Sequence, residues 1–420
     1  MGIGGIGISA IARMMHARGV HVSGSDVAES EVTKNLREAG IGVTIGQSLD
    51  LIPPNAELIV YSNAIKKLDD DFFEKLKSLG QPMKSYPELL GEVSKDMCTI
   101  AISGTHGKTT TTGMIGTMLI DLALDPTVVV GSLLLREKSN FIQGKSDIFV
   151  TEADEYRRAF HNLYPTILII TNIDLDHLDY YKDLADIQSA FYELALRVPE
   201  NGAIVCNPND PHVMPILAGI KAKIIDYTKE NIIGLSLRFP GAHNIENAQA
   251  TLGVAHILNI DHTQAIKSLN GFQGTWRRFE YKGETKNGAL VYDDYAHNPQ
   301  KIRAALAGTR ELYAQQRIVA VFQPHLYSRT KFLLDDLAQS FGDADEIVLV
   351  PIYAAREHDD GTISSDMLAQ EISKHNRLVR SLSSFEAVTN HLNDTVQKGD
   401  VIMLLGAGDI NNLASTLITE

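Results

Sequence analysis

Residues 104–110 have the types and order of a phosphate-binding loop: Gly104, Thr105, His106, Gly107, Lys108, Thr109 and Thr110. An apolar run at 99–102 predicts a strand before them, and a helical pattern follows. Glycines let backbone N–H groups approach phosphate oxygens, and the N-terminus of the following helix adds partial positive charge. Lys108 could reach terminal phosphates, and the Thr109 hydroxyl could ligate Mg²⁺. The loop predicts a nucleoside triphosphate site in a shortened form, because position 102 is Ile102 and not glycine.

Two acidic segments follow the next predicted strands. The strand 148–151 leads into Glu152-Ala153-Asp154-Glu155, and the strand 167–170 leads into a segment that ends in Asp176 and His177. A carboxylate at the C-terminal end of a strand beside a phosphate loop is a natural Mg²⁺ ligand. One such segment alone is more typical of a solvated loop, but two on successive strand ends favour a metal site.

The N-terminus carries a second glycine-rich loop, Gly2-Ile3-Gly4-Gly5-Ile6-Gly7, with Asp26 about twenty residues further on, after a predicted strand at 20–23. This spacing fits a dinucleotide site and therefore an oxidoreductase, although the motif alone is weak. An oxidoreductase would leave the loop at 104–110 unexplained. The glycine-rich loop should follow a strand, yet the sequence opens at Met1, so we expect a first strand to be missing through a truncated or mis-assigned start.

Short apolar runs alternate with amphipathic stretches along all 420 residues, which indicates an α/β fold built on largely parallel, buried strands. The length predicts about three domains. The formal net charge of −14 argues against binding to nucleic acid or a membrane surface. Two distant cysteines, Cys98 and Cys206, favour reduced thiols in the cytoplasm. No signal peptide or membrane-spanning stretch is expected.

The run Gly-Thr-His-Gly-Lys-Thr-Thr-Thr-Thr from Gly104 and the segments 243–248, 293–299 and 322–330 resemble motifs of the Mur ligases of peptidoglycan synthesis. The resemblance covers almost the whole chain. It implies a Rossmann-like domain at 1–96, a central P-loop ATPase-like domain at 97–281 and a C-terminal Rossmann-like domain at 282–420. It also implies an ATP- and Mg²⁺-dependent ligase that joins L-alanine to the lactyl carboxylate of UDP-N-acetylmuramate through an acyl phosphate. We expect a cytoplasmic monomer or weak homodimer.

Roles for individual residues follow from this resemblance. Thr109, Glu152 and His177 would hold Mg²⁺. On the nucleotide, Asn244 and Asn247, which we expect just before a helix, would contact adenine, Arg278 the phosphates and Asp294 the ribose. On the sugar nucleotide, the contacts would come from Gly4, Gly5, Gly7, Asp26, Ser62 and Asn63. On the amino acid, Arg329 would clamp the carboxylate and His325 would orient it, while His297 would face the reaction centre, with both histidines as candidates for the general base.

The chain departs from the family pattern at three places. Tyr156-Arg157-Arg158 replaces a Ser-Asp pair, and the two arginines could meet substrate or form a solvated turn. Leu326 stands where many members carry a second arginine. The stretch 188–193 lacks the lysine that some members carbamylate, which favours an L-alanine ligase over the members that add glutamate or diaminopimelate. A ligase that recycles a tripeptide onto the same nucleotide sugar, and a non-catalytic nucleotide-binding protein, remain alternatives.

Overall fold

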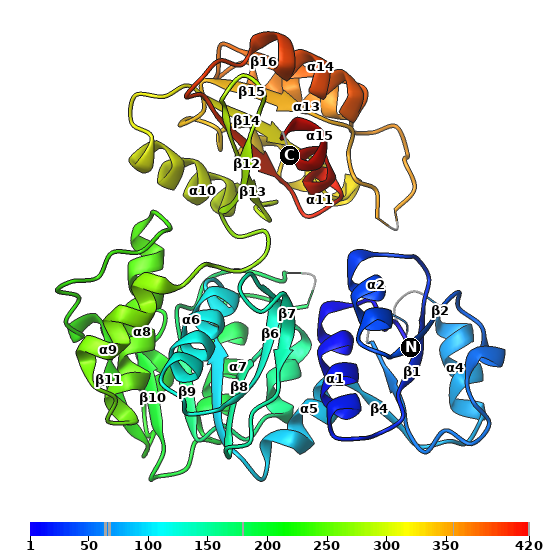
Figure 1. Ribbon diagram of the computed structural model, residues 1–420, viewed down its shortest axis with the longest axis vertical. Helices are drawn as coiled ribbons and strands as arrows, with labels where there is room; N and C mark the ends of the chain where they lie inside the picture. The colour runs from blue at the N-terminus through cyan, green and yellow to red at the C-terminus, as the bar shows by residue number, and fades with distance from the viewer. Residues whose placement is uncertain (63–64, 66–68, 179, 356, 419–420) are drawn as a thin grey trace. The chain divides into compact units, whose positions relative to one another are not determined.

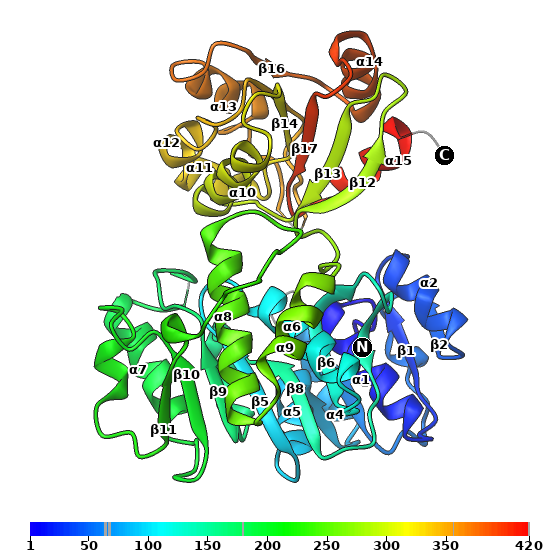
Figure 2. The ribbon, with the colours of Figure 1, turned by 60° about the vertical axis from the view of Figure 1, so that its left-hand side comes forward.

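The computed structural model describes residues 1–62, 65, 69–178, 180–355 and 357–418, and the chain folds into two compact units (Figures 1 and 2). One unit contains residues 1–237 and 243–275, and the other contains residues 238–242 and 276–420. Both are α/β, which confirms the predicted fold class. The first two predicted domains lie in one compact unit, and the boundaries at 96/97 and 281/282 stay a prediction.

A seven-stranded sheet forms the centre of the first unit, in the order β11-β10-β9-β5-β8-β6-β7. All neighbours pair in parallel except β6 and β7. The inner strands are buried on both faces, as their continuous apolar runs predict. The strands are β5 (Cys98–Ser103), β6 (Thr127–Leu134), β7 (Ser139–Ile142), β8 (Ile148–Glu152), β9 (Ile167–Ile170), β10 (Ala203–Cys206) and β11 (Lys223–Asp226).

Helices cover both faces of this sheet (Figure 2). One face packs against a cluster that includes residues of α1 (Ile6–Ala17), α5 (Tyr86–Ser94) and α7 (Leu184–Ala195). The other carries α6 (Lys108–Asp121), α8 (Ala242–Ile257) and α9 (His262–Gly271). Gly116 of α6 lies so close to β6 that a Cβ atom would stand 3.0 Å from Val128. The glycines of α6 therefore bring this helix down onto the sheet.

The N-terminal part of this unit contains two separate two-stranded parallel sheets. The predicted strand at 20–23 is wrong by three residues: β1 spans Ser23–Asp26, so Asp26 is its last residue and not a loop residue after it. Met1 lies between the sheets, because its amino group donates to Val60 O and the amide of Gly2 donates to Ser25 O. The expectation that a first strand is missing through a truncated or mis-assigned start stays a prediction. The remaining elements are α2 (Glu31–Glu38), β2 (Gly42–Ile45), β3 (Ile59–Tyr61), α4 (Asp70–Ser78) and β4 (Met83–Ser85).

The second unit is built on a six-stranded sheet in the order β12-β13-β17-β14-β15-β16. Only the pair of β12 and β13 is antiparallel. Its strands are β12 (Glu280–Glu284), β13 (Leu290–Asp294), β14 (Ile318–Phe322), β15 (Glu346–Leu349), β16 (Val379–Ser381) and β17 (Val401–Leu405). One face packs on α10 (Pro299–Leu312), α12 (Leu334–Ala338) and α13 (Ser365–Ile372), and the other on α14 (Phe385–Thr395) and α15 (Leu413–Leu417).

Short helical turns complete both units: η1 (Leu49–Leu51), η2 (Tyr156–Asn162), η3 (Met214–Leu217), η4 (Tyr227–Lys229), α11 (Tyr327–Phe332) and η5 (Ile410–Asn412). Within the described ranges, no helix combines the length and apolar character needed to cross a bilayer.

A buried asparagine joins the first glycine-rich loop to the central sheet. The Asn140 side chain, 1% exposed on β7, donates from Nδ2 to Ile6 O at 2.6 Å and to Ser9 Oγ at 2.8 Å in α1. Two buried hydrogen bonds of this kind hold α1, and with it the loop that precedes it, against β7.

We therefore expect Asn140→Ala to lower the free energy of unfolding by about 1–3 kcal/mol, because buried hydrogen-bond partners lose their donor. Chemical denaturation measures this change. Asn201→Ala, at an exposed turn, is the matched control and should stay within about 0.5 kcal/mol of the parent. Equal effects of the two variants would contradict this account of α1.

Candidate functional site

The loop at 104–107 joins β5 to α6, and α6 begins at Lys108 as the sequence predicts for a phosphate loop. Gly107 precedes the helix with φ of +85°, and Gly104 has φ of +136°, both favoured by glycine. A Cβ atom on Gly104 would lie 2.0 Å from Thr171 Oγ1. Glycine is therefore needed at position 104 for space as well as for conformation.

The segment after β9 clamps this loop from the side. The Thr171 hydroxyl donates to His106 O at 2.6 Å, and the Asn172 side chain accepts from His106 N at 2.9 Å. The amide of Thr105 donates to Asn172 O at 3.1 Å. These contacts fix the loop backbone from residues that lie 65–67 positions further along the chain, and no local pattern in the sequence indicates this role.

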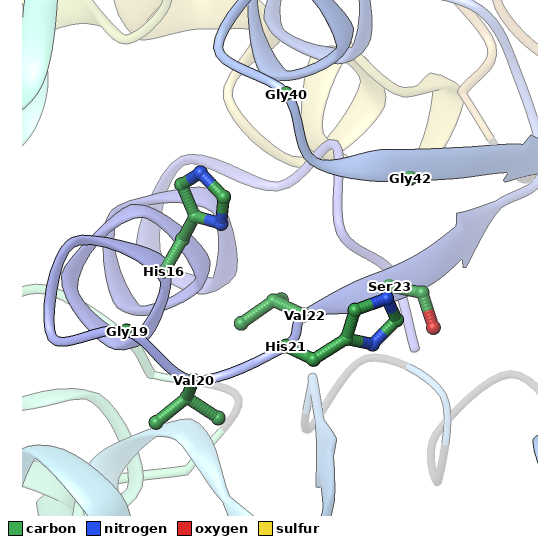
Figure 3. A pocket seen from close by; sticks show the side chains of 8 residues that line it. All are labelled: His16, Gly19, Val20, His21, Val22, Ser23, Gly40 and Gly42. Atoms are coloured by element: carbon green, nitrogen blue, oxygen red, sulfur yellow. The ribbon is translucent and has the colours of Figure 1, made fainter.

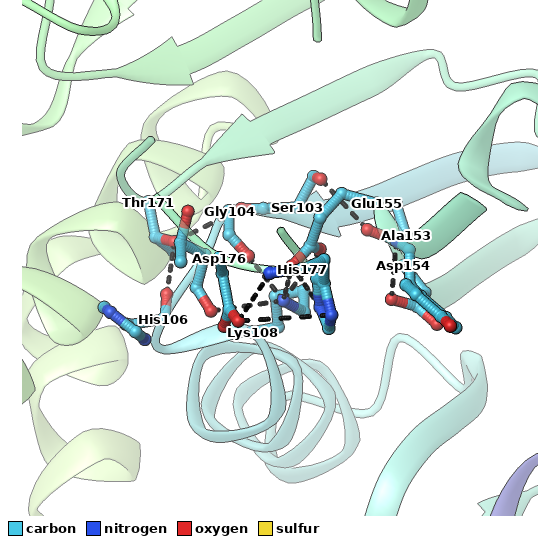
Figure 4. A network of polar contacts seen from close by, with 12 residues as sticks. Ser103, Gly104, His106, Lys108, Ala153, Asp154, Glu155, Thr171, Asp176 and His177 are labelled. Carbon is cyan, nitrogen blue, oxygen red and sulfur yellow. Dashed lines mark hydrogen bonds and ion pairs between the residues drawn. The ribbon is translucent and has the colours of Figure 1, made fainter. Parts of the chain in front are cut away.

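Lys108 is folded back onto its own loop (Figure 4). Its Nζ donates to Gly104 O at 2.5 Å and to Thr105 O at 3.3 Å, and pairs with the Glu155 carboxylate at 2.8 Å. The Glu155 side chain is only 3% exposed. Burial by itself would lower the pKa of Lys108, but the carboxylates around it, Glu155 first, outweigh this and raise the pKa. The lysine therefore stays charged.

Asp154, Glu155 and His177 form a group whose ligand atoms lie within 4.8 Å of one another. Asp154 is exposed to solvent overall, but desolvation of its carboxyl group by the surrounding side chains and the negative charge of Glu155 raise its pKa. Burial also opposes ionisation of Glu155, yet Lys108 and His177 hold its pKa below the ordinary value. The Glu155 carboxylate, 3.6 Å from His177 Nε2, outweighs burial and raises the pKa of His177. Two carboxylates and an imidazole in this arrangement could hold a divalent cation.

Glu152, predicted as a metal ligand, ends β8 but lies outside that group of described residues. Its Oε1 accepts from Gly131 N at 2.6 Å, which fixes the direction of the carboxylate. Thr109, the other predicted ligand, is buried in the first turn of α6. The acidic run Glu-Ala-Asp-Glu predicts a metal segment, but within it the resemblance points to Glu152, whereas the structure brings Asp154 and Glu155 next to His177.

The two arginines after this acidic run have different surroundings. Both have positive φ, 52° for Arg157 and 56° for Arg158, which strains non-glycine residues. Arg158 pairs with Asp186 and Glu193 of α7, each at 2.8 Å. Its charge is therefore used to fasten the acidic loop to α7, while the Arg157 guanidinium lies over the Tyr156 ring.

Asn244 and Asn247 lie inside α8, not before a helix, so that part of the prediction is wrong. Both are buried. Asn247 Oδ1 accepts from the Thr111 hydroxyl of α6 at 3.1 Å and would lie 2.4 Å from a Cβ atom on Gly107. The helix α8 thus places both amides beside the start of α6, which lies next to the phosphate loop.

Two neighbouring arginines at the start of the second unit, Arg277 and Arg278, have different surroundings. Arg277 is buried, pairs with Asp293 at 3.1 Å, and donates to Gly406 O and Gly408 O. Burial raises the pKa of Asp293 to about 7, against the opposing effect of Arg277. Arg278 is half-buried and lies over the Tyr295 ring. Arg277 therefore fastens the entering chain to the end of β17.

Asp294, the predicted ribose acceptor, ends β13 and already accepts two backbone hydrogen bonds. Phe279 N donates to Oδ2 and Ala296 N donates to Oδ1, both at 2.8 Å. The carboxylate is therefore held in one orientation.

The structure brings together His297, His325 and Arg329 of the second unit. The two imidazole rings have centroids 6.1 Å apart, and Arg329 Nη1 lies 3.2 Å from His325 Nδ1. The His325 ring stacks on Tyr353 at 5.6 Å. Burial lowers the pKa of both histidines. The positive charges of Lys301 and Arg329 lower the pKa of His297 further, and the charge of Arg329 does the same for His325. Two neutral imidazoles therefore lie beside a guanidinium.

The N-terminal loop is closed by Asp26. Gly4 N donates to Asp26 Oδ2 at 2.8 Å, and a Cβ atom on Gly4 would meet that oxygen at 2.9 Å. Gly5 N donates to Gly2 O, and a Cβ atom on Gly7 would meet the Tyr86 ring. Ser62 N donates to Met1 O, which places Ser62 beside the same loop. Asn63 lies outside the described residues.

A hollow of about 480 Å³ opens at the other end of β1 (Figure 3). It is lined by His16, Gly19, Val20, His21, Val22, Ser23, Gly40 and Gly42. Within the described ranges, none of the predicted site residues lines this hollow, which lies at the amino end of β1.

Comparisons with known proteins cover all of these segments. Residues 1–97 match the description "Mur ligase family, catalytic domain", residues 102–232 "Mur ligase middle domain" and residues 277–408 "Mur ligase, glutamate ligase domain". A UDP-N-acetylmuramate–L-alanine ligase of Clostridium kluyveri is 40% identical over 447 aligned positions, covering 100% of this chain and 97% of the relative. The ligase of the same name from Clostridium perfringens is 38% identical, covering 98% of this chain and 95% of the relative.

Solved structures give the same grouping. The UDP-N-acetylmuramate–alanine ligase of Thermotoga maritima superimposes with a TM-score of 0.83 at 27% identity, covering 99% of this chain and 96% of that one. A murein peptide ligase of Psychrobacter arcticus superimposes with a TM-score of 0.74 at 25% identity, covering 100% of this chain and 98% of that one.

Gly104→Ala should disrupt the phosphate loop, because the added methyl group would overlap the Thr171 hydroxyl and strain the backbone. We expect a loss of about 1–3 kcal/mol in the free energy of unfolding, measured by denaturant titration. Gly271→Ala is the matched control, since a Cβ atom at the end of α9 meets nothing within 4 Å. A Gly104 variant as stable as the Gly271 variant would refute the predicted overlap.

Arg277→Met should lower the free energy of unfolding by about 3–5 kcal/mol, because it leaves Asp293 and two loop carbonyls without their buried partner. Thermal and chemical unfolding measure the loss. The same substitution one residue later, Arg278→Met, should cost less than about 1 kcal/mol. The reverse order of the two variants would show that we have exchanged the roles of these arginines.

Proposed function

The chain belongs to the Mur ligase family, and from this premise we infer that it is the ATP-dependent ligase that joins L-alanine to UDP-N-acetylmuramate. The lactyl carboxylate is activated as an acyl phosphate and the amine of L-alanine displaces phosphate, so ADP and phosphate are released. The reaction is a step of peptidoglycan synthesis. The observation that carries this conclusion is the full-length match, at 38–40% identity, to relatives that bear this name.

We propose that residues 104–110 hold the triphosphate of ATP. The loop is already clamped by Thr171 and Asn172, so its amides are oriented before a nucleotide arrives. Lys108 contacts two loop carbonyls and Glu155, and phosphate oxygens would take over these contacts. The charge that Lys108 retains would stabilise the negative charge of the transferring phosphoryl group.

We propose that Thr109, Glu152 and His177 hold Mg²⁺, with Asp154 and Glu155 adding negative charge. The donor types fit, because carboxylate and hydroxyl oxygens are the ligands that Mg²⁺ prefers, and Asp154, Glu155 and His177 offer ligand atoms within 4.8 Å of one another. When bound, Mg²⁺ would neutralise phosphate charge and polarise the phosphoryl group. Within the chain, Gly131 orients Glu152, and the ion pairs of Arg158 hold the acidic loop against α7.

The remaining nucleotide contacts are proposed from both units. Asn244 and Asn247 offer buried amides next to the start of α6, which suits the edge of adenine. Asp294 is held by two backbone amides, and its carboxylate would accept from ribose hydroxyls. Arg278, whose stem lies on Tyr295, is the arginine available for phosphate, since Arg277 is buried against Asp293.

The two other substrates are assigned to separate loops. We propose that Gly4, Gly5, Gly7, Asp26, Ser62 and Asn63 contact the sugar nucleotide. In the second unit, Arg329 would bind the carboxylate of L-alanine in a bidentate pair, with His325 beside it. His297 is the third polar side chain of that group.

The L-alanine interpretation is favoured over the tripeptide-recycling interpretation because full-length relatives at 38–40% identity bear the L-alanine ligase name. The solved L-alanine ligase also superimposes with a TM-score of 0.83, against 0.74 for the murein peptide ligase. The oxidoreductase alternative depended on the glycine-rich loop at residues 2–7. That loop lies within residues 1–97, which match a Mur ligase domain. We further propose a cytoplasmic enzyme, in keeping with two free cysteines, that works as a monomer or weak homodimer and binds neither nucleic acid nor membrane.

Phosphate release is the direct test. We expect it only when ATP, Mg²⁺, UDP-N-acetylmuramate and L-alanine are all present, and we expect chelation by EDTA to stop it reversibly. Lys108→Met should slow release by about 100-fold or more, because one fixed charge at the transferring group is lost. Lys221→Met, on an exposed lysine paired with Glu200, is the control and should keep the parent rate.

Two results would change the conclusion. Equal phosphate release without the sugar nucleotide or without an amino acid would contradict the ligase assignment. Release that is faster with the tripeptide than with L-alanine would instead identify the tripeptide-recycling activity.

A further inference from the structure

Tyr86 lies where the N-terminal part of the first unit packs on the central sheet. It is the first residue of α5, and the Ser85 side chain before it caps that helix. Its half-buried ring packs against two apolar clusters. One contains residues of the N-terminal loop, α1 and α2, and the other contains residues of the central sheet and its helices. Tyr86 therefore contacts both parts of the unit.

The glycine-rich loop is shaped to accept this ring. A Cβ atom on Gly7 would lie 2.9 Å from two ring carbons of Tyr86, Cε1 and Cζ. Only a residue without a side chain allows such a close approach. Gly7 belongs to the first turn of α1, and Cζ is the carbon that carries the hydroxyl group. A molecule bound at residues 4–7 would therefore lie next to the Tyr86 hydroxyl.

The acidic run is also near Tyr86. Burial, and then the negative charges of Glu152 and Asp154, raise the pKa of the Tyr86 hydroxyl above its ordinary value. The helix α5 packs closely on the turn that follows the acidic run, since a Cβ atom on Gly91 would lie 2.3 Å from Asn162 O. The hydroxyl therefore keeps its hydrogen and is a donor close to two carboxylates.

The hydroxyl group of Tyr86 has no hydrogen-bond partner among the described residues. It is not one of the buried polar atoms that lack a partner, so water reaches it. Buried tyrosine hydroxyls normally bond within the protein. Tyr181 does so with Glu155 O at 2.5 Å, and Tyr227 does so with Thr171 O at 2.9 Å. Tyr86 instead offers an unused donor between the two loops.

We propose that Tyr86 is a positioning residue for the sugar nucleotide and that its hydroxyl donates a hydrogen bond to the lactyl carboxylate. This inference rests on the proposed function. There the sugar nucleotide contacts residues 4–7, while its carboxylate must reach the phosphoryl group held near Lys108 and the acidic run. A ligand that extends from one loop to the other passes Tyr86, and the carboxylate is its acceptor at the acidic end.

A neutral donor suits this place better than a charged one. The substrate carboxylate is repelled by Glu152 and Asp154, so a hydrogen bond is needed to offset the repulsion. A lysine here would pair with those carboxylates, as Lys108 does with Glu155. The tyrosine hydroxyl forms no ion pair with them and stays available. By holding one oxygen of the substrate carboxylate, it leaves the other oxygen directed at the phosphoryl group.

The test compares two nucleotides that differ only in the lactyl group. UDP-N-acetylglucosamine has the nucleotide and the acetylated sugar of UDP-N-acetylmuramate, but no carboxylate. Tyr86→Phe removes one oxygen atom and keeps the ring that packs on Gly7. By calorimetric titration with Mg²⁺ and without ATP, we expect the affinity of this variant for UDP-N-acetylmuramate to fall about tenfold or more. Its affinity for UDP-N-acetylglucosamine should stay within about twofold of the parent, because that ligand lacks the acceptor.

Two controls separate this role from a structural one. Tyr164→Phe, on an exposed tyrosine of the same unit, should leave both affinities unchanged. The denaturation midpoint of Tyr86→Phe should not fall, because the hydroxyl has no partner in the protein. If UDP-N-acetylglucosamine binds too weakly to measure, the KM values decide. The KM for UDP-N-acetylmuramate should then rise about tenfold, with the KM for ATP within about twofold of the parent.

Equal losses for both nucleotides, equal rises of both KM values, or an unchanged affinity for UDP-N-acetylmuramate would overturn the role of Tyr86. A lower denaturation midpoint would also overturn it, because the hydroxyl would then have a partner within the protein. A parent protein that binds neither nucleotide would contradict the proposed function itself.

Discussion

The close fit between Gly104 and Thr171 is the constraint on which the first site depends. The loop after β5 can lie against the segment after β9 only because position 104 has no side chain. That approach lets Thr171 and Asn172 hold His106 at both its carbonyl and its amide. The same edge of the sheet carries the end of β8, so Ser103 can donate to Ala153 O and fix the acidic run beside the loop. Lysine, carboxylates and histidine are thereby brought together by neighbouring strands.

The second unit follows the same rule with different residues. Parallel strands bring the ends of β13, β17 and β14 to one edge. Asp294, His297 and His325 follow these ends, and each is oriented by a backbone group or an adjacent side chain. Arg277 supports this edge from behind by binding two carbonyls of the turn after β17. Buried polar contacts therefore position the reactive groups, because loops alone would leave them several rotamers.

Much of this arrangement could be predicted from the sequence, and the failures have physical causes. The phosphate loop, the start of α6 and the α/β class were visible, because glycine spacing and apolar runs are local signals. The role of Thr171 and Asn172 was not visible, since it depends on β5 pairing with β9 across more than sixty residues. Asn244 and Asn247 were expected just before a helix, but the helix begins at Ala242 and contains both residues. Sequence alone also could not assign Arg277 to the core and Arg278 to the surface, because only the fold gives these neighbours different surroundings.

The contacts of Lys108 have a consequence for how the first site fills. The ammonium group already has a full set of partners in the protein alone, namely two carbonyls and a carboxylate. An arriving anion therefore exchanges partners at this lysine and does not order a disordered loop. The loop loses its conformational entropy during folding and not on anion binding. Anion binding is opposed instead by Glu155, which competes for the Lys108 ammonium group. A small anion that offers one weak contact gains little from such an exchange, whereas a chelating polyphosphate gains several contacts at once. Competition from Glu155 therefore favours a ligand that makes several contacts in this loop over a small anion that makes one.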